Sequence, residues 1–179
     1  MKRSVDYHDY SIKDGKLIGK FEDMYRYSAQ VPWHQDKIIE RYYGRIYLNV
    51  IEYAFEKKVK SVLEVGCGYG YVLSKLKRNG ISFSGFDVSA TAISMATELH
   101  PDINFFVDDL RRLSHKKKYD LVICKDVLWY VLNDFDAVIN NLCSLIEDAG
   151  CVFVGLSFPN LEKPYFGKEL LGGPEELCG

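Results

Sequence analysis

Short apolar segments alternate with longer amphipathic segments along most of the chain. Apolar and aromatic residues recur at helical spacing over residues 38–54, which predicts one long amphipathic helix. The segment 60–65 is short, apolar, rich in β-branched residues and followed by glycines, so it is typical of a buried strand. A further helix is expected after the glycines, ending at Asn79 and Gly80.

The same alternation continues through the second half of the chain. It predicts strands over 82–87, 103–107, 119–124 and 150–158, and helices over 89–99 and 134–147. Ser89 is expected to cap the first of these helices and Asp134 the second. Strands that alternate with helices need crossover connections, which make the strands parallel. We therefore expect an α/β fold with a doubly wound, mostly parallel sheet.

The strand expected at 150–158 is the last that the pattern predicts. Its continuous apolar character is typical of a strand covered on both faces, and its outer edge would be bare unless something pairs with it. The N-terminal segment, a partner chain or a further C-terminal portion is therefore expected to cover it.

Composition and charge limit the class of protein. The chain has 179 residues, 47% of them hydrophobic, which is sufficient for one domain with a sizeable core. Its 23 basic and 25 acidic residues give a net charge of −2, so nucleic acid is not an expected partner. No run of 18 apolar residues and no apolar segment behind the basic start is present, so we expect a cytoplasmic protein without a membrane partner.

The cysteines show neither a Cys-x-x-Cys motif nor a Cys/His pair at the spacing of metal ligands. We therefore expect reduced thiols and no metal site. The five residues are Cys67, Cys124, Cys143, Cys151 and Cys178.

Three glycines lie within five positions directly after the strand expected at 60–65. Such a turn in a parallel sheet places helix amides at the carboxyl edge of the strands, where ligands bind. Glycine also lets the main chain approach a ligand without a Cβ in the way. The glycines are Gly66, Gly68 and Gly70.

Two carboxylates accompany the glycines. Glu64 precedes Gly66 by two positions, and Asp87 ends the next expected strand, 21 positions after Gly66. A carboxylate at that strand end can accept hydrogen bonds from the two hydroxyls of a ribose. The alternative role of Asp87 is to cap the helix that begins near Ser89.

This pattern resembles the signature of class I S-adenosylmethionine (SAM) dependent methyltransferases. The resemblance covers about residues 38–158. The segment FFVDDL at 105–110 resembles the acidic third motif of the family, and YDLVICKDVLWYV at 119–131 resembles the fourth. The family implies a Rossmann-like fold, here without the usual C-terminal strands. It also implies a SAM-binding domain over 38–179, preceded by a lid or substrate segment over 1–37.

The resemblance implies that SAM is the cofactor and S-adenosylhomocysteine (SAH) the product. Gly66, Cys67 and Gly68 would lie against the methionine portion of SAM, and Gly70 belongs to the same loop. Glu64 would lie near the ammonium group of SAM or organise this loop. Asp87 would hold the ribose.

The remaining cofactor contacts follow from the third and fourth motifs. Val88 would pack on the adenine, and Asp109 with the Leu110 amide would bind its amino edge, although Asp108 is easily confused with Asp109. The cofactor residue Lys125 would face the methionine portion or the methyl acceptor, as would Asp126. Lys125 departs from the small or polar residue expected at its position.

A dinucleotide-binding dehydrogenase is the alternative for the glycine loop. Its G-x-G-x-x-G motif needs a third small residue where this chain has Tyr71, and an aromatic ring there would obstruct close packing of helix on strand. The glycine spacing therefore favours the methyltransferase.

Two segments carry candidate acceptor residues. Tyr25, Trp33 and His34 lie in 24–35, which contains a proline and is expected to be a loop or lid. Trp129 and Tyr130 follow the fourth expected strand, with core packing as the alternative for Trp129.

An alcohol acceptor must lose its proton, for which His34 and Asp126 are the candidate catalytic residues. A position on the surface or at a helix start is the alternative for His34.

We expect transfer of a methyl group to an oxygen or nitrogen of a small molecule, such as a sugar-linked or secondary metabolite. The alternative is a methyltransferase-like binding or partner subunit without catalysis, because the usual C-terminal strands are lacking and the base is not obvious. A homodimer would be one form of such a partnership.

Overall fold

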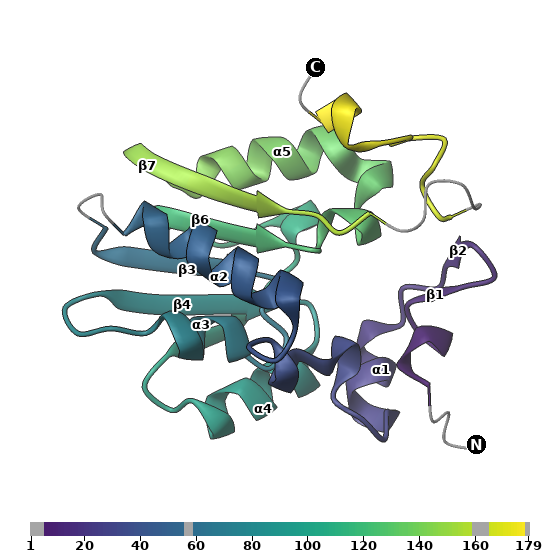
Figure 1. Ribbon diagram of the computed structural model, residues 1–179, viewed down its shortest axis with the longest axis horizontal. Coiled ribbons are helices and arrows are strands. Elements are labelled where there is room, and N and C mark those ends of the chain that lie inside the picture. Colours follow the sequence, from purple (N-terminus) through teal and green to yellow (C-terminus); the bar gives the residue numbers. More distant parts are fainter. Residues whose placement is uncertain (1–5, 56–58, 159–164, 178–179) are drawn as a thin grey trace.

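The computed structural model describes residues 6–55, 59–158 and 165–177 of the chain. Five parallel strands form its central sheet in the order β5-β4-β3-β6-β7 (Figure 1). The strands are β3 (Ser61–Val65), β4 (Ser82–Asp87), β5 (Asn104–Val107), β6 (Tyr119–Lys125) and β7 (Ile146–Gly155). The predicted doubly wound α/β fold is confirmed.

Helices lie on both faces of this sheet. The helices are α2 (Tyr42–Ala54), α3 (Tyr71–Leu76), α4 (Ala90–Leu99) and α5 (Phe135–Ser144). Val62 of β3 packs with Ile51 of α2 and Leu73 of α3, whereas its neighbour Leu63 packs with Val138 of α5. Successive strand side chains point to opposite faces, so this apolar strand contributes to two cores at once.

The helix predicted over 38–54 is shorter than expected, because α2 begins at Tyr42. Arg41 is extended, and the carbonyl oxygen of Ile38 lies where a Cβ on Gly44 would stand. The chain therefore folds back tightly over the first helical turn, which only glycine permits. Within α2, Gly44 and Ile51 are buried.

Two further predictions concern helix ends. The Ser89 side chain accepts a hydrogen bond of 3.1 Å from the Ala92 amide, so the predicted cap of α4 is confirmed. Asp134 precedes α5 but makes no capping hydrogen bond with its side chain. α5 ends at Ser144, earlier than predicted, because Ile146 already pairs with Tyr119 as the first residue of β7.

β7 is an edge strand and, among the described residues, pairs with β6 alone. Its Val152 and Val154 side chains are 41% and 44% exposed. From residue 6 onward, the N-terminal segment lies beyond the carboxyl ends of the strands rather than beside β7 (Figure 1). Of the three expected ways to cover β7, the described part of the N-terminal segment is therefore not used.

The N-terminal segment contains more regular structure than expected. It forms a hairpin of β1 (Ile12–Lys13) and β2 (Lys16–Leu17), then α1 (Phe21–Tyr27). The loop predicted over 24–35 is wrong for residues 24–27, which belong to α1. The buried side chains of Met24 and Tyr25 stabilise this helix. Asp14 and Gly15 have positive φ at the hairpin turn. Asp-Gly pairs favour such turns, so the sequence contained a signal that could have predicted this hairpin. No helix in the described part of the chain is long and apolar enough to cross a membrane.

Candidate functional site

A cavity of about 440 Å³ lies at the carboxyl ends of β3, β4 and β6. Its lining comes from the loops after the strands, from α2 and from the N-terminal segment. Most of the predicted site residues line it together: Tyr25, Trp33, His34, Glu64, Gly66, Cys67, Asp87, Val88, Asp109, Leu110, Lys125, Asp126, Trp129 and Tyr130.

Gly68 and Gly70 are the predicted residues outside this lining. Both have positive φ, 53° and 75°. A Cβ on Gly68 would meet the Gln35 side chain and, at 2.7 Å, the hydroxyl of Tyr25. A Cβ on Gly70 would meet the ring of Phe105 at 2.5 Å. Protein side chains therefore approach the main chain closely at these two positions, which is why glycine is required there.

Gln35 connects the N-terminal segment to the glycine loop. Its Oε1 accepts a hydrogen bond of 3.1 Å from the Tyr69 amide. Sequence reasoning missed this residue, because a glutamine in an irregular segment carries no signal of its partner. The segment that precedes α2 is thus joined to the loop at the floor of the cavity.

Glu64 brings a buried carboxyl group to the cavity. The residue is 4% exposed, and its Oε2 is buried without a hydrogen-bond partner among the described residues. Burial raises the pKa of this carboxyl to about 8, and the charge of Lys125 opposes that rise. An unpartnered carboxyl oxygen is costly to bury, so the site fits a ligand with a cationic or hydrogen-bond-donating group.

Asp87 holds the end of β4 to the glycine loop. Its Oδ2 accepts a hydrogen bond of 3.0 Å from the Gly68 amide, and its Oδ1 accepts one of 2.9 Å from the Ser89 amide. Burial raises its pKa to about 6, while these amides act in the opposite direction. A carboxylate oxygen can accept more than one hydrogen bond, so both oxygens can still bind hydroxyl groups of a ligand.

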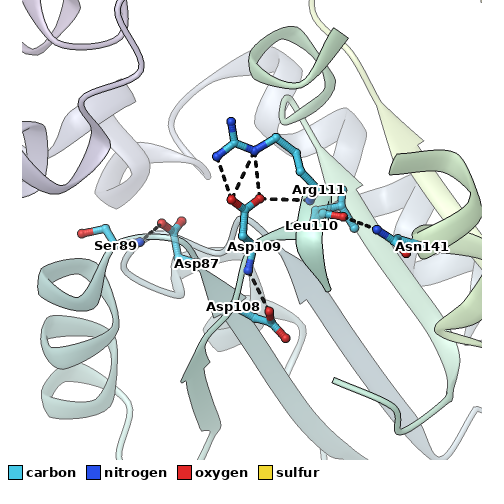
Figure 2. A network of polar contacts seen from close by, with 7 residues as sticks. All are labelled: Asp87, Ser89, Asp108, Asp109, Leu110, Arg111 and Asn141. Atoms are coloured by element: carbon cyan, nitrogen blue, oxygen red, sulfur yellow. Dashed lines mark hydrogen bonds and ion pairs between the residues drawn. The ribbon is translucent and has the colours of Figure 1, made fainter. Parts of the chain in front are cut away.

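Asp108 and Asp109, which the sequence could not separate, have different partners (Figure 2). Asp108 accepts hydrogen bonds from the Asp109, Ser114 and His115 amides, so it organises its own loop. The Asp109 carboxylate points the opposite way and binds the guanidinium of Arg111 at 2.7 Å.

An apolar edge lies beside these carboxylates. Val88 is 44% exposed at the cavity, and Leu110 lines it as well. The Asn141 side chain donates a hydrogen bond of 2.8 Å to the Leu110 carbonyl, which holds this loop in place (Figure 2). The position of Asn141, on the later helix α5, was not evident from the sequence.

Lys125 and Asp126 form an ion pair where β6 ends. The Lys125 ammonium lies 2.5 Å from Asp126 Oδ2, and the Ser157 amide donates to Asp126 Oδ1 at 2.8 Å. The Lys125 ammonium also lies 4.9 Å from the centre of the Tyr47 ring. Both oxygens of Asp126 are engaged, which fixes the orientation of this carboxylate at the cavity wall.

Aromatic rings form the opposite wall. Trp33 and Tyr130 lie with ring centres 5.7 Å apart, and Phe21 lies edge-on to Tyr130 at 5.1 Å. Trp129 is 8% exposed, donates a 3.0 Å hydrogen bond to the Ser157 carbonyl and packs against Phe158. Trp129 therefore serves mainly the core, whereas Trp33 and Tyr130 face the cavity.

Backbone strain is concentrated at this cavity. Four non-glycine residues in the described part of the chain have positive φ, namely Asp14, Trp33, His34 and Asp126. The last three line the cavity. A left-handed backbone costs about 1–2 kcal/mol for an L-residue, and such residues concentrate at functional sites. The surrounding structure therefore holds three predicted site residues at the cavity wall in spite of the backbone cost.

His34 lines the cavity from the N-terminal side, and its ring lies edge-on to Tyr7 at 6.1 Å. Within the described ranges, no three His, Cys, Asp or Glu residues gather as a group that could hold a metal ion. The described cysteines are free, and Cys178 lies outside the described residues.

Comparison with known proteins gives consistent results. The family model of a methyltransferase domain matches residues 36–163. A ubiquinone biosynthesis O-methyltransferase of Coxiella burnetii is 30% identical over 147 residues, which are 78% of this chain and 61% of that protein. The corresponding protein of Rickettsia bellii is 31% identical over 97 residues, 52% of this chain and 40% of its own length. The chain thus spans about half the length of these relatives.

Solved structures share the fold. The N-methyltransferase NodS of Bradyrhizobium japonicum, in complex with SAH, has a TM-score of 0.59 and 21% identity, covering 69% of this chain and 65% of its own. The plantazolicin methyltransferase BamL, in complex with SAH and a triazolic desmethylPZN analogue, has a TM-score of 0.57 and 25% identity, covering 82% of this chain and 55% of its own. The chain belongs to the methyltransferase-domain family and, as its glycine loop and strand-end carboxylates predicted, to the class I SAM-dependent methyltransferases.

Proposed function

We propose that this protein uses SAM to methylate an oxygen or nitrogen atom of a small molecule. The observation that carries the proposal is the unpartnered Glu64 oxygen, buried beside Asp87 at the end of a parallel sheet. A ligand with both a cationic amino-acid portion and a ribose satisfies these two carboxyl groups together. The matching family model supports the same ligand.

The residues present fit SAM along the cavity. Glu64 would bind the ammonium group, Asp87 the ribose hydroxyls and Asp109 the adenine edge, while Val88 and Leu110 would contact the adenine ring. SAM supplies an activated methyl group on a sulfonium when bound. The contribution of the protein is then to align the acceptor and exclude water.

The N-terminal segment, residues 1–37, is proposed to act as the lid of the domain formed by residues 38–179. Trp33 and His34 of this segment line the cavity, and the Trp33 ring packs against Tyr130 with ring centres 5.7 Å apart. Glu22 attaches the segment to α4 through hydrogen bonds of 2.7 Å from Ser89 Oγ and 2.6 Å from Thr91 Oγ1. A lid joined in this way excludes water from the acceptor.

The cavity of about 440 Å³ must also hold SAM, so a small acceptor fits it better than a polymer. The O-methyltransferase relatives support an oxygen acceptor, and the plantazolicin methyltransferases support a secondary metabolite. His34 would take the acceptor's proton, because histidine is the side chain that most often acts as a general base. His34→Ala should then lower turnover about 10²–10⁴-fold while SAH affinity is retained.

Isothermal titration of the intact protein with SAH tests the proposal. We expect one site per chain with saturable binding, and competition by SAM. Absence of binding by folded protein would remove the basis of the proposed function.

A binding or partner subunit without catalysis is the second candidate, and the exposed Val152 and Val154 on the bare edge of β7 favour it. Under this candidate, a homodimer or a heterologous complex would complete the sheet. A purified monomer that methylates an acceptor unaided would contradict it.

A further inference from the structure

The outer side of α2 carries an apolar face that the described part of the chain leaves open. Its side chains are between 40% and 72% exposed, and from Tyr43 to Tyr53 they recur three and four positions apart, on one side of the helix. This outer face consists of Tyr42, Tyr43, Ile46, Val50 and Tyr53. The opposite side of α2 packs on the sheet through the buried Ile51, and Tyr47 contacts Phe153 of β7 with ring centres 5.9 Å apart.

A helix that is apolar on both sides is ordinarily buried on both sides. Aromatic side chains bury about 150–250 Å² each, so the outer face of α2 presents about 500 Å² of accessible surface. Each partner in a standard protein–protein interface contributes about 800 Å². The polar residues that border the face, Arg45 and Asn49, are exposed and would supply part of the difference. The face is therefore large enough for a modest interface with micromolar affinity.

Strands added beside β7 would not cover this face. They would extend the sheet in its own plane, whereas α2 lies against one face of the sheet and its outer side points away from the strands (Figure 1). A membrane is a poorer fit, because a helix that lies on a membrane ordinarily carries several lysines or arginines on its polar side. α2 carries one arginine and one glutamate, namely Arg45 and Glu52. A protein surface therefore fits the outer face best.

The two charged residues of α2 indicate which protein surface this is. Arg45 and Glu52 lie seven positions apart and thus on the same flank of the helix, one toward each end. A second α2 packed antiparallel on the outer face brings the Arg45 end of each helix beside the Glu52 end of the other, whereas a parallel copy would place like charges together. Glu52 already accepts a hydrogen bond of 3.2 Å from Arg78, and a carboxylate can accept more than one.

We propose that two copies of this chain associate through the outer faces of α2, packed antiparallel about a two-fold axis. The same face is then used by both copies, as a closed dimer requires. Tyr43 of each copy packs against Tyr53 of the other, and Ile46 packs against Val50. Because Tyr43 also lines the cavity, the second copy lies at the cavity rim. This dimer leaves the edge of β7 open, and it does not depend on the proposed function.

Sedimentation equilibrium of the intact chain, at concentrations on the order of 1–100 μM, tests the dimer. Val50→Glu places a charge within the outer face. Val152→Glu on β7 is the matched control, because the two valines are similarly exposed, at 51% and 41%. We expect the wild type and Val152→Glu to dimerise alike. Val50→Glu should weaken dimerisation about tenfold or more, because it would bury an unpaired carboxylate.

Charge exchange tests the antiparallel arrangement. Arg45→Glu and Glu52→Arg should each weaken dimerisation about two- to tenfold at low salt, because like charges then meet at both ends of the interface. The double variant Arg45→Glu/Glu52→Arg should restore the wild-type affinity. In a parallel dimer the single variants would not weaken association. Weakened single variants without recovery in the double variant would also contradict the antiparallel packing.

A wild type that stays monomeric at the highest concentration would overturn the proposal, as would an unchanged affinity in Val50→Glu. Dissociation in Val152→Glu alone would move the interface to β7. Flotation with vesicles of phosphatidylglycerol and phosphatidylcholine tests the membrane, and a monomeric wild type that floats while Val50→Glu does not would assign the face to a lipid surface. SAH affinity is measured on the same proteins, so loss of the dimer with SAH binding retained leaves the proposed function intact.

Discussion

The Gly68 amide donates a hydrogen bond of 3.0 Å to the Asp87 carboxylate, so the loop after β3 is tied to the end of β4. The same carboxylate faces the cavity. The Asp87 side chain therefore holds the loop in place and is also accessible to a ligand. Substitution of Asp87 tests both roles.

Asp87→Ala should weaken SAH binding about ten- to a hundredfold, because charge-assisted hydrogen bonds to a ribose contribute about 1.5–3 kcal/mol. Asp87→Asn keeps one acceptor oxygen and should lose less. Isothermal titration measures both, with Asp148→Asn on the exposed surface as the control. Unchanged affinity in a folded Asp87→Ala protein would place the ribose elsewhere.

Glu64 should make the ligand-free protein less stable as the pH rises. Its folded pKa of about 8 exceeds the ordinary value of 4.5, so the folded state keeps a proton that the unfolded chain releases between these values. The free energy of unfolding should therefore fall from about pH 5 to pH 8. Urea denaturation across this range should show the decline in the wild type. Glu64→Gln should flatten it between about pH 7 and 8, above the raised pKa of Asp87 of about 6. Equal slopes for the two proteins would contradict the burial of an ionisable group.

Cofactor binding should release a proton from Glu64 near neutral pH, because the ammonium group of SAH favours the ionised carboxylate. Titrations in two buffers of different ionisation enthalpy should give different observed enthalpies at pH 7. In Glu64→Gln this difference should largely disappear. Identical wild-type enthalpies in both buffers would indicate that Glu64 does not bind the ammonium group of SAH.

Gly68→Ala should destabilise the protein through its contact with the N-terminal segment. Its φ of 53° costs about 1–2 kcal/mol for alanine, and the added Cβ would also collide with Gln35 and the Tyr25 hydroxyl. Thermal unfolding should show a lower midpoint. Gly80→Ala has a similar positive φ but open space, so it should show the backbone cost alone. Equal losses of stability in the two variants would indicate that Gln35 and Tyr25 do not pack tightly against Gly68.

Glu22→Gln should loosen α1 without unfolding the sheet. Hydrogen bonds from Ser89 and Thr91 lower the pKa of Glu22 to about 2, so this attachment is present above the ordinary value of 4.5 and is lost as the pH falls toward 2. Hydrogen exchange in α1 should speed up in Glu22→Gln at neutral pH and in the wild type below about pH 3. Asp23→Asn, the next residue of the same helix, is the control. Unchanged exchange in Glu22→Gln would mean that other contacts hold α1.

The aromatic wall of the cavity and the N-terminal segment show where prediction from the sequence ends. The expectation that His34, Trp33 and Tyr130 lie near the strand ends was sound because each follows or precedes a recognisable element. The helix α1, the Gln35 contact with Tyr69 and the pairing of Lys125 with Asp126 were not predictable. Each depends on which side chains meet after the N-terminal segment folds onto the sheet. The spacing of neighbouring residues in the sequence does not indicate these contacts.

The order of strands and helices follows from local patterns, because apolar runs of strand length and stripes of helical spacing are properties of neighbouring residues. The glycines and the carboxylates Glu64 and Asp87 likewise mark the strand ends in the sequence itself. Tertiary structure alone decides that Gly68 accommodates Tyr25 and Gln35 and that Asp108 and Asp109 point apart. It also decides that one Glu64 oxygen is buried without a partner in the described part of the chain. These properties depend on distances between residues far apart in the chain, and such distances exist only once the core has formed.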